Sequence, residues 1–173
     1  VLVVLWIIGV YNGLVKLNTR TTEAWSDIDV QLKRRHDLIP NLIETVKGAK
    51  NFEQSTILAV TEARSRWSGA KTPSEQVAAT NNLESALSRL LVVVENYPDL
   101  KSNQNFLALQ DELAGTENRI SVERQRYNEV VGTYNKKLRV FPTVIVANLF
   151  GFEKRDFFQS EQGAEKAVAV SFE

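Results

Sequence analysis

The side chains with the clearest chemical potential in this sequence are its single histidine and its scattered serines. His36 follows Lys33 at the spacing where a di-iron helical bundle carries a glutamate three residues before the histidine. Because lysine takes that place, the spacing predicts no metal site. None of the serines has a histidine at a natural partner position in the sequence, so nucleophilic hydrolysis is not indicated. The serines nearest to His36 in the sequence are Ser26, Ser55, Ser65, Ser68 and Ser74.

A second candidate for chemistry is the segment Gly69-Ala70-Lys71-Thr72, which matches the last residues of a phosphate-binding loop. The earlier glycine and the strand of that motif are missing. Thr72-Pro73-Ser74-Glu75 instead predicts a capping box with proline in the first helical position. The sequence has no cysteine, which excludes thiolate nucleophiles, disulfides and sulfur-bound zinc. We therefore expect no catalytic residue, no cofactor and no metal, and a protein that is not an enzyme.

Composition limits the classes to which the protein can belong. Its 173 residues suffice for one domain with appendages, and 43% apolar against 24% charged residues predicts a folded chain. Lysine and arginine together number 21, as do aspartate and glutamate, so the net charge is zero. Because a neutral chain has no global field that gathers phosphates, we expect no nucleic-acid partner.

The N-terminus is an apolar segment that we interpret as part of a transmembrane helix. The residues expected to span the membrane are Val1, Leu2, Val3, Val4, Leu5, Trp6, Ile7, Ile8, Gly9 and Val10. As a helix they cover about 15 Å, whereas a bilayer core is about 30 Å thick. Since the chain contains no methionine, we expect the rest of the span upstream of Val1. The alternative is the core of a secretory signal, but no small-residue cleavage site follows.

The remaining helices are predicted from apolar spacing and from breaking residues. A long amphipathic helix continues from residue 14 to 47, with Pro40 inside it as an expected kink. Further helices are expected over 51–68, 73–96, 100–140 and, as a short element, 143–150. The helix over 100–140 keeps a seven-residue apolar repeat typical of coiled coils. The expected organisation is a transmembrane anchor over 1–15, a helical bundle domain over 16–141, and a short amphipathic helix with an extended tail over 142–173.

The predicted fold class is all-α, because no segment alternates apolar and polar residues over a length that would form the strands of a sheet. Long first and fourth helices with two shorter ones between them fit an antiparallel up-and-down four-helix bundle with short loops. The fourth helix then returns to the membrane. The alternative is a single rod over 11–68, with the later helices packed on part of it; Gly48 and Pro40 argue against that rod.

Charged residues are dense in the first long helix, so some must face a neighbouring helix. If Leu14 lies level with Leu138 in an antiparallel pair, facing residue numbers sum to about 152. This register places Arg35 opposite Glu117. We expect such pairs to fix the register more than to add stability, since desolvation offsets their attraction. The same register brings Asp27 or Asp29 near Arg124.

The same helix offers a functional alternative to these interhelix pairs. Polar side chains gather around Pro40, namely Arg34, Arg35, Asp37 and Asn41. At a helix kink they can form a site for a ligand or a partner. The structural interpretation is preferred, because a packed helix must place part of its charge toward its neighbours.

Basic residues cluster where the bundle is expected to meet the membrane. The possible headgroup contacts are Lys16, Arg20, Lys136, Lys137 and Arg139. Because positive charges that follow a span stay on the cytoplasmic side, they favour a cytoplasmic bundle. The apolar residues 144–150 follow and can either lie in the lipid interface or pack on the end of the bundle.

Many ordered matches give the chain a resemblance to the LemA family. They include Tyr11-Asn12, Ala24-Trp25-Ser26, Ile28-Asp29-Val30-Gln31-Leu32-Lys33-Arg34-Arg35, Asp37-Leu38-Ile39-Pro40-Asn41-Leu42, Tyr97-Pro98, Thr116-Glu117, Tyr127-Asn128, Tyr134-Asn135, Phe141-Pro142 and Gly151-Phe152. The resemblance spans nearly the whole chain. It implies a bacterial membrane protein with one N-terminal span and a cytoplasmic four-helix bundle, and it carries over no catalytic residue. One relative is linked to shaping magnetosome membranes.

Taken together, these features predict a single-pass protein of the bacterial inner membrane with a structural role. We expect it to contact membrane lipid, to form a homo-oligomer, and to act as a scaffold that organises or remodels membrane. A membrane protein partner is possible. The alternative function is that of an adaptor or regulator in envelope-stress signalling or membrane proteolysis.

Overall fold

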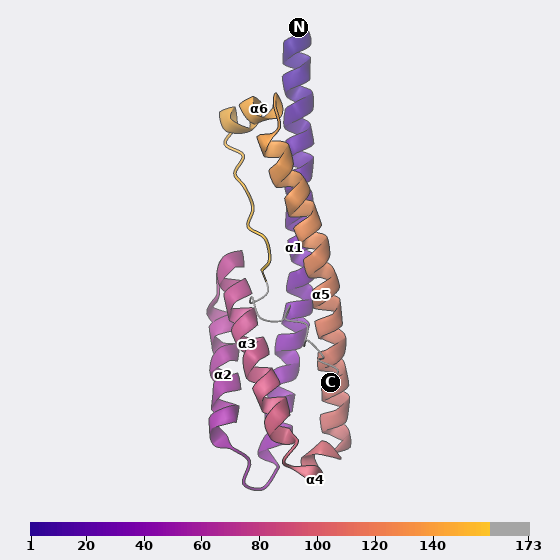
Figure 1. Ribbon diagram of the computed structural model, residues 1–173, viewed down its shortest axis with the longest axis vertical. Coiled ribbons are helices and arrows are strands. Elements are labelled where there is room, and N and C mark those ends of the chain that lie inside the picture. The colour runs from indigo at the N-terminus through magenta and orange to yellow at the C-terminus, as the bar shows by residue number, and fades with distance from the viewer. Residues whose placement is uncertain (160–173) are drawn as a thin grey trace, which may run out of the picture. The chain divides into compact units, whose positions relative to one another are not determined.

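In the computed structural model of the protein, residues 1–159 are described (Figure 1). Within that range every regular element is a helix, as the predicted all-α class requires. The helices are α1 (Leu2–Lys47), α2 (Gln54–Gly69), α3 (Pro73–Val94), α4 (Pro98–Lys101), α5 (Gln104–Arg139) and α6 (Thr143–Leu149). The tail expected to be extended over 167–172 lies outside the described residues.

Helix α1 runs without interruption from the apolar N-terminus to Lys47. It continues through Pro40, which lies inside the helix and removes only the amide that would bond to the carbonyl of His36. The chain then leaves helical geometry before α2, where Asn51 adopts a positive φ of 64°. Asparagine tolerates that conformation better than most residues. The single rod over 11–68 is therefore wrong, because α1 and α2 are separate helices.

The start of α3 follows the predicted capping box. The Thr72 side chain accepts a hydrogen bond from the Glu75 amide, and the Glu75 carboxylate accepts from the amide of Thr72. Pro73 occupies the first turn, where its missing amide costs no hydrogen bond. The sequence signal for this boundary is confirmed.

The start of the long last helix differs from the prediction. The chain forms the short helix α4 after Tyr97, and α5 begins only at Gln104. The cause is Asn103, whose side-chain oxygen accepts from the amides of Asn105 and Phe106 at 2.9 and 3.1 Å. This is an N-terminal cap that satisfies amides with no partner inside the helix.

The described residues divide into two compact units, and α1 and α5 contribute to both. The second unit contains residues 36–113. Its core draws on α1, α2, α3, α4 and α5, and α2 packs along α3. The principal buried residues are Ile39, Leu42, Val46, Ile57, Val60, Leu83, Leu87, Leu90, Leu100 and Phe106. Each such side chain contributes roughly 1.5–3 kcal/mol on burial.

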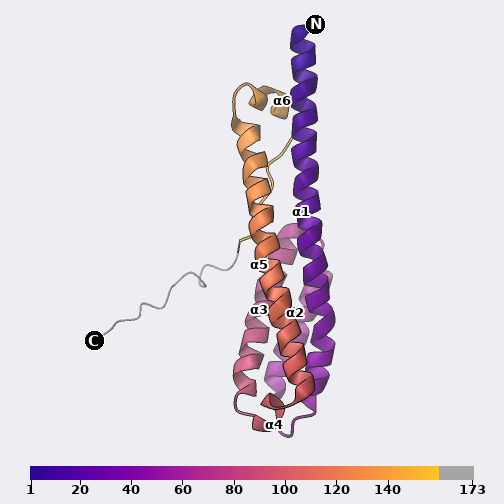
Figure 2. The same ribbon diagram turned by 90° about the vertical axis from the view of Figure 1, so that its right-hand side faces the viewer.

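The first unit contains residues 1–35 and 114–157, in which α1 and α5 run antiparallel (Figure 2). Leu14 shares a buried cluster with Tyr134 and Leu138. Farther along, the ring of Trp25 meets that of Tyr127 edge-on with centroids 5.4 Å apart. Helix α6 completes the cluster at the N-terminal end through Ala147.

Candidate membrane-proximal surface

The first turns of α1 expose their apolar side chains to solvent. Val1 to Leu5 are 58–98% exposed, and Trp6 and Ile8 are also largely exposed. Among the described residues, α1 is the one helix with a stretch long and apolar enough to cross a membrane. The first residues of the predicted spanning segment thus stand free of the protein core, whereas Val10 packs against the buried cluster and Leu14, one turn later, is fully buried.

Helix α6 lies beside α1 just below this free segment (Figures 1 and 2). The ring of Phe150 lies 4.8 Å from that of Tyr11, and the ring of Phe152 lies 5.6 Å from it. Val146 and Ala147 are buried, so one face of α6 packs within the first unit. The other face of α6 is exposed through Ile145 and Leu149.

The basic residues predicted to contact headgroups all lie exposed in the first unit. Lys16 and Arg20 follow the free segment on α1, and the remaining three occupy the last turn of α5. Cations in that turn also complement the partial negative charge of a helix C-terminus. The structure thus places Lys136, Lys137 and Arg139 next to the start of α6.

An extended segment follows α6 and runs back along α5; we call residues 151–158 the strap. The hydroxyl of Tyr134 donates to the Glu153 carbonyl at 3.0 Å, and that of Tyr127 donates to the Asp156 carbonyl at 2.9 Å. Seven helical residues rise about 10.5 Å, and three extended residues span about 10 Å. The seven-residue spacing of the tyrosines therefore matches the three-residue spacing of the carbonyls.

The strap is also fixed at Arg155, which forms hydrogen bonds with the side chains of Asn135 and Asn18. The side-chain nitrogen of Asn135 donates to the Arg155 carbonyl at 2.8 Å, and the side-chain oxygen of Asn135 accepts from the backbone amide of Arg155 at 3.0 Å. The Arg155 guanidinium donates twice to the side-chain oxygen of Asn18, at 3.1 and 3.2 Å. The strap thereby connects α5 to α1 within the first unit.

Burial favours the protonated form of the two strap tyrosines further. Desolvation raises the pKa of Tyr127 and of Tyr134, and the nearby Arg155 charge opposes that rise in both cases. Both hydroxyls therefore remain protonated donors in the neutral range. The Tyr-Asn pairs in the sequence gave no indication of this role, because their partners are backbone carbonyls of a segment whose path along α5 the sequence did not predict.

Among the predicted interhelix pairs, the structure brings together Arg35 and Glu117. The Arg35 guanidinium donates to the Glu117 carboxylate; the Arg35 side chain is 10% exposed and that of Glu117 is 41% exposed. Asp29 pairs with Lys33, one turn away in the same helix, at 2.6 Å. A pair between Asp27 or Asp29 and Arg124 stays a prediction.

The surroundings of Pro40 contain a contact that sequence reasoning missed. His36 lies 2.9 Å from the Ser68 hydroxyl through Nε2, and its ring lies on Trp67 with centroids 4.7 Å apart. Its Nδ1 lies 3.4 Å from an oxygen of Asp37. Ser68 is 32 positions away in the sequence, so only the folding of α2 onto α1 reveals the pairing.

Ser68, His36 and Asp37 follow one another as the serine, histidine and aspartate of a serine hydrolase do, but their surroundings do not favour nucleophilic hydrolysis. Ser68 lies in the last turn of α2, where the helix dipole places negative charge and disfavours an oxyanion. The Asp37 carboxylate is exposed at the surface, so it holds the imidazole in high dielectric. The arrangement is best described as a contact between α1 and α2. Within residues 1–159, no group of three or more His, Asp or Glu side chains is placed to hold a metal ion.

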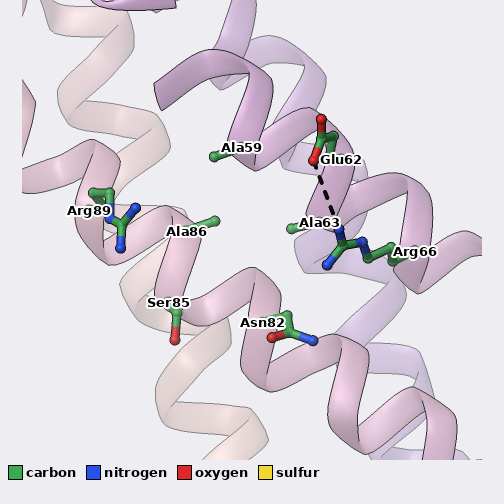
Figure 3. Close-up of a pocket in the computed structure, with 8 residues that line it drawn as sticks. All are labelled: Ala59, Glu62, Ala63, Arg66, Asn82, Ser85, Ala86 and Arg89. Carbon is green, nitrogen blue, oxygen red and sulfur yellow. Dashed lines mark ion pairs between the residues drawn. The ribbon is translucent and has the colours of Figure 1, made fainter. Parts of the chain in front are cut away.

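A shallow groove runs between α2 and α3 (Figure 3). Small side chains form its floor, and Glu62 pairs with Arg66 across one turn of α2 at 3.9 Å. The groove is lined by Ala59, Glu62, Ala63, Arg66, Asn82, Ser85, Ala86 and Arg89.

These features define an all-helical protein with a free apolar helix end and a basic border. Residues 24–172 match the LemA family, and the chain belongs to that family. It is 27% identical over 156 residues to Protein LemA of Metamycoplasma hominis, covering 90% of this chain and 71% of that protein. It is also 24% identical over 184 residues to Magnetosome protein MamQ 2 of Paramagnetospirillum magneticum, covering 91% of this chain and 68% of the relative. Magnetosome protein MamQ of Magnetospirillum gryphiswaldense is 23% identical with the same coverage.

Proposed function

We propose that the protein is a non-catalytic, single-pass membrane protein that self-associates and organises membrane through its helical domain. The observation that carries this proposal is the 58–98% exposure of the consecutive apolar residues Val1 to Leu5, since transfer of such a patch from water into an apolar environment is favourable. The relatives named as magnetosome proteins support the structural role. In this proposal the helices form an antiparallel up-and-down four-helix bundle with long first and fourth helices.

Two exposed valines support lateral self-association of the first unit. Val30 on α1 and Val122 on α5 are both largely exposed. Trp25 and Tyr127, which are in ring contact, lie five residues before Val30 and five residues after Val122 respectively, so the antiparallel pairing places the two valines at the same level. Because five residues turn a helix by about 500°, each valine points away from the ring contact, and each offers a separate outward apolar position for another copy of the chain.

The experiment compares the intact chain with a chain that lacks residues 1–9. This boundary leaves Val10 and Leu14 in place, which pack in the cluster with Tyr134. Light scattering in detergent gives the mass, and electron microscopy of reconstituted vesicles shows any coat or change of membrane shape. We expect a defined oligomer from the intact chain only. Val30→Lys with Val122→Lys should reduce it, and the exposed Val92→Lys on α3 is the matched control. A monomeric intact chain would contradict the scaffold and favour an adaptor.

The proposed location is the bacterial inner membrane, with the helical domain on the cytoplasmic side. Lys16 and Arg20 support this orientation, since basic residues next to a span stay in the cytoplasm. The chain has no native cysteine, so Ser102→Cys gives one reactive site in an exposed loop of the domain. We expect a membrane-impermeant thiol reagent to label it only after the cells are opened. Labelling of intact spheroplasts would reverse the orientation.

A further inference from the structure

The turn between α5 and α6 and the outer face of α6 form a second exposed apolar surface. Phe141 is 75% exposed and Leu149 is 72% exposed, with Val140, Ile145 and Phe150 also exposed. The opposite face of α6 is buried through Val146 and Ala147. The short helix therefore presents one apolar face to its own unit and another to its surroundings. We call the exposed set, namely Val140, Phe141, Ile145, Leu149 and Phe150, the α6 surface.

The α6 surface is continuous with the free end of α1. Phe150 contacts Tyr11 with ring centroids 4.8 Å apart, and Tyr11 directly follows the apolar segment that ends at Val10. If residues 1–10 lie in the hydrocarbon core of a membrane, the boundary between that core and the headgroups lies near Tyr11. Aromatic side chains such as Tyr11 are favoured at such a boundary, because they combine an apolar ring with a polar atom.

Positive charge lies on the side of the α6 surface away from the free end. Lys16 is about 9 Å along α1 from Val10, just beyond a headgroup layer that is about 5–7.5 Å thick, and a lysine side chain is long enough to reach back into that layer. Lys136, Lys137 and Arg139 occupy the end of α5 directly before the turn. Within the described part of the chain these four side chains form no ion pair, because the carboxylates that do form ion pairs bind other basic residues. Apolar residues bordered by unpaired cations complement an anionic lipid surface.

We propose that the α6 surface lies in the headgroup region of the same bilayer that holds α1 and binds anionic phospholipid. The proposal rests on the proposed membrane anchoring and adds a second contact to it. A crossing helix alone constrains the tilt and rotation of the unit less than a crossing helix and an interfacial helix do together, because interfacial side chains act as additional anchors. The α6 surface would thus set how the helical domain leaves the membrane.

Spin labels on single cysteines test the proposal in the intact chain, which has no native cysteine. Ile145→Cys and Leu149→Cys report the α6 surface, and Leu5→Cys reports the anchor. Leu58→Cys on α2 is a matched control, because Leu58 is a leucine with 58% exposure in a helix of the second unit. The labelled protein is reconstituted in vesicles of neutral lipid alone or with added phosphatidylglycerol. Collision rates with oxygen report lipid, and those with a nickel chelate report water.

We expect the nickel collision rates at Ile145 and Leu149 to be several-fold lower than at Leu58, and to fall further with phosphatidylglycerol. Lys136→Gln, Lys137→Gln and Arg139→Gln combined should remove the dependence on anionic lipid while Leu5 stays in lipid. Water exposure at Leu149 with Leu5 in lipid would overturn the α6 proposal but leave the anchor intact. Water exposure at Leu5 would overturn the anchor itself. Low collision rates with both reagents at Leu149 would indicate a protein neighbour, such as a second copy, and would also overturn the lipid assignment.

Discussion

The strap is held by the hydroxyls of Tyr127 and Tyr134, so its stability depends on whether these two hydroxyls are protonated. Burial raises the pKa of both hydroxyls above the usual value of about 10. The folded state therefore holds these protons more tightly than the unfolded chain does. The resulting stability is fully present below about pH 10 and is lost as the pH rises through the raised pKa.

We expect tyrosinate absorbance to appear at higher pH in the folded protein than in protein unfolded in guanidinium. Tyr127→Phe and Tyr134→Phe should each remove part of the delayed absorbance and one hydrogen bond to the strap, at a cost of about 1 kcal/mol. Protection of strap amides against hydrogen exchange should fall in both variants. Identical titrations of the folded and unfolded protein would show that the hydroxyls are not buried donors.

The contact between Arg35 and Glu117 allows a measurement of what one interhelix ion pair contributes. Because the Glu117 side chain is 41% exposed, solvent screens the attraction, and we expect a coupling energy of about 1 kcal/mol. A double-mutant cycle with Arg35→Met and Glu117→Gln, followed by chemical unfolding, gives this coupling. Lys47→Met and Glu44→Gln form the control cycle, since that pair lies within one helix and is exposed on both sides. A coupling no larger than that of the control would assign the register to apolar packing alone.

Residues differ in how far the sequence could predict their partners. Arg35 and Glu117 follow from one assumption about an antiparallel register, because both lie in regular helices whose rise is constant. His36 and Ser68 do not, since their contact depends on where the chain turns between Lys47 and Gln54. The hydrogen bonds of Tyr134 depend on the path of the strap, which has no periodicity to extrapolate.

At the scale of single elements, the N-terminus of α3 depends on its capping box. Thr72→Ala removes the acceptor for the Glu75 amide and should lower the free energy of unfolding by about 1 kcal/mol. Two backbone hydrogen bonds, from Lys71 and Thr72, lower the pKa of Glu75. The contribution of the Glu75 carboxylate to the free energy of unfolding is present above the pKa that Glu75 has in the unfolded chain. It is lost as the pH falls through the lowered pKa of the folded state. Thermal unfolding of the variant at neutral and acid pH checks both effects, and Ser74→Ala is the neighbouring control.

Two glycines should respond oppositely to alanine because their backbones differ. Gly151 follows α6 with a φ of +69°, and no atom lies within 4 Å of an added Cβ, so Gly151→Ala meets backbone strain alone, about 1 kcal/mol. Gly132 is helical, and an added Cβ would lie 3.7 Å from the Phe157 ring, an ordinary contact. Gly132→Ala should stabilise by up to about 1 kcal/mol. Thermal midpoints in detergent that move in the same direction for both variants would contradict this assignment.

The helices themselves were the most predictable elements. Apolar spacing located α1, α2, α3, α5 and α6, because each buries one stripe of side chains. The boundaries were correct where a side chain dictates them, as at Thr72, and wrong where a cap was overlooked, as at Asn103. An extended tail was expected after α6, but the path of the strap was not predicted, because its hydrogen bonds are to side chains of α5 and α1 and not to a neighbouring strand.

At the scale of the whole molecule, the exposed apolar end of α1 can be changed without changing the folded core, so its part in holding the protein in a membrane can be tested separately. Leu2 is strongly exposed and lies far from the buried cluster around Leu14, so a charge there leaves the folded core unchanged. Near the centre of a span, an arginine in place of a leucine costs about 3 kcal/mol on the scale of membrane insertion. The same substitution outside a membrane costs almost nothing.

We therefore expect Leu2→Arg to move a substantial part of the intact chain from the membrane fraction to the alkaline-soluble fraction. Leu58→Arg, at an exposed leucine on α2, should stay in the membrane as the original chain does. Circular dichroism of both variants in detergent should show unchanged helix content. If Leu2→Arg and Leu58→Arg partition alike, the free end of α1 does not hold the protein in the bilayer, and another surface of the chain must account for its location.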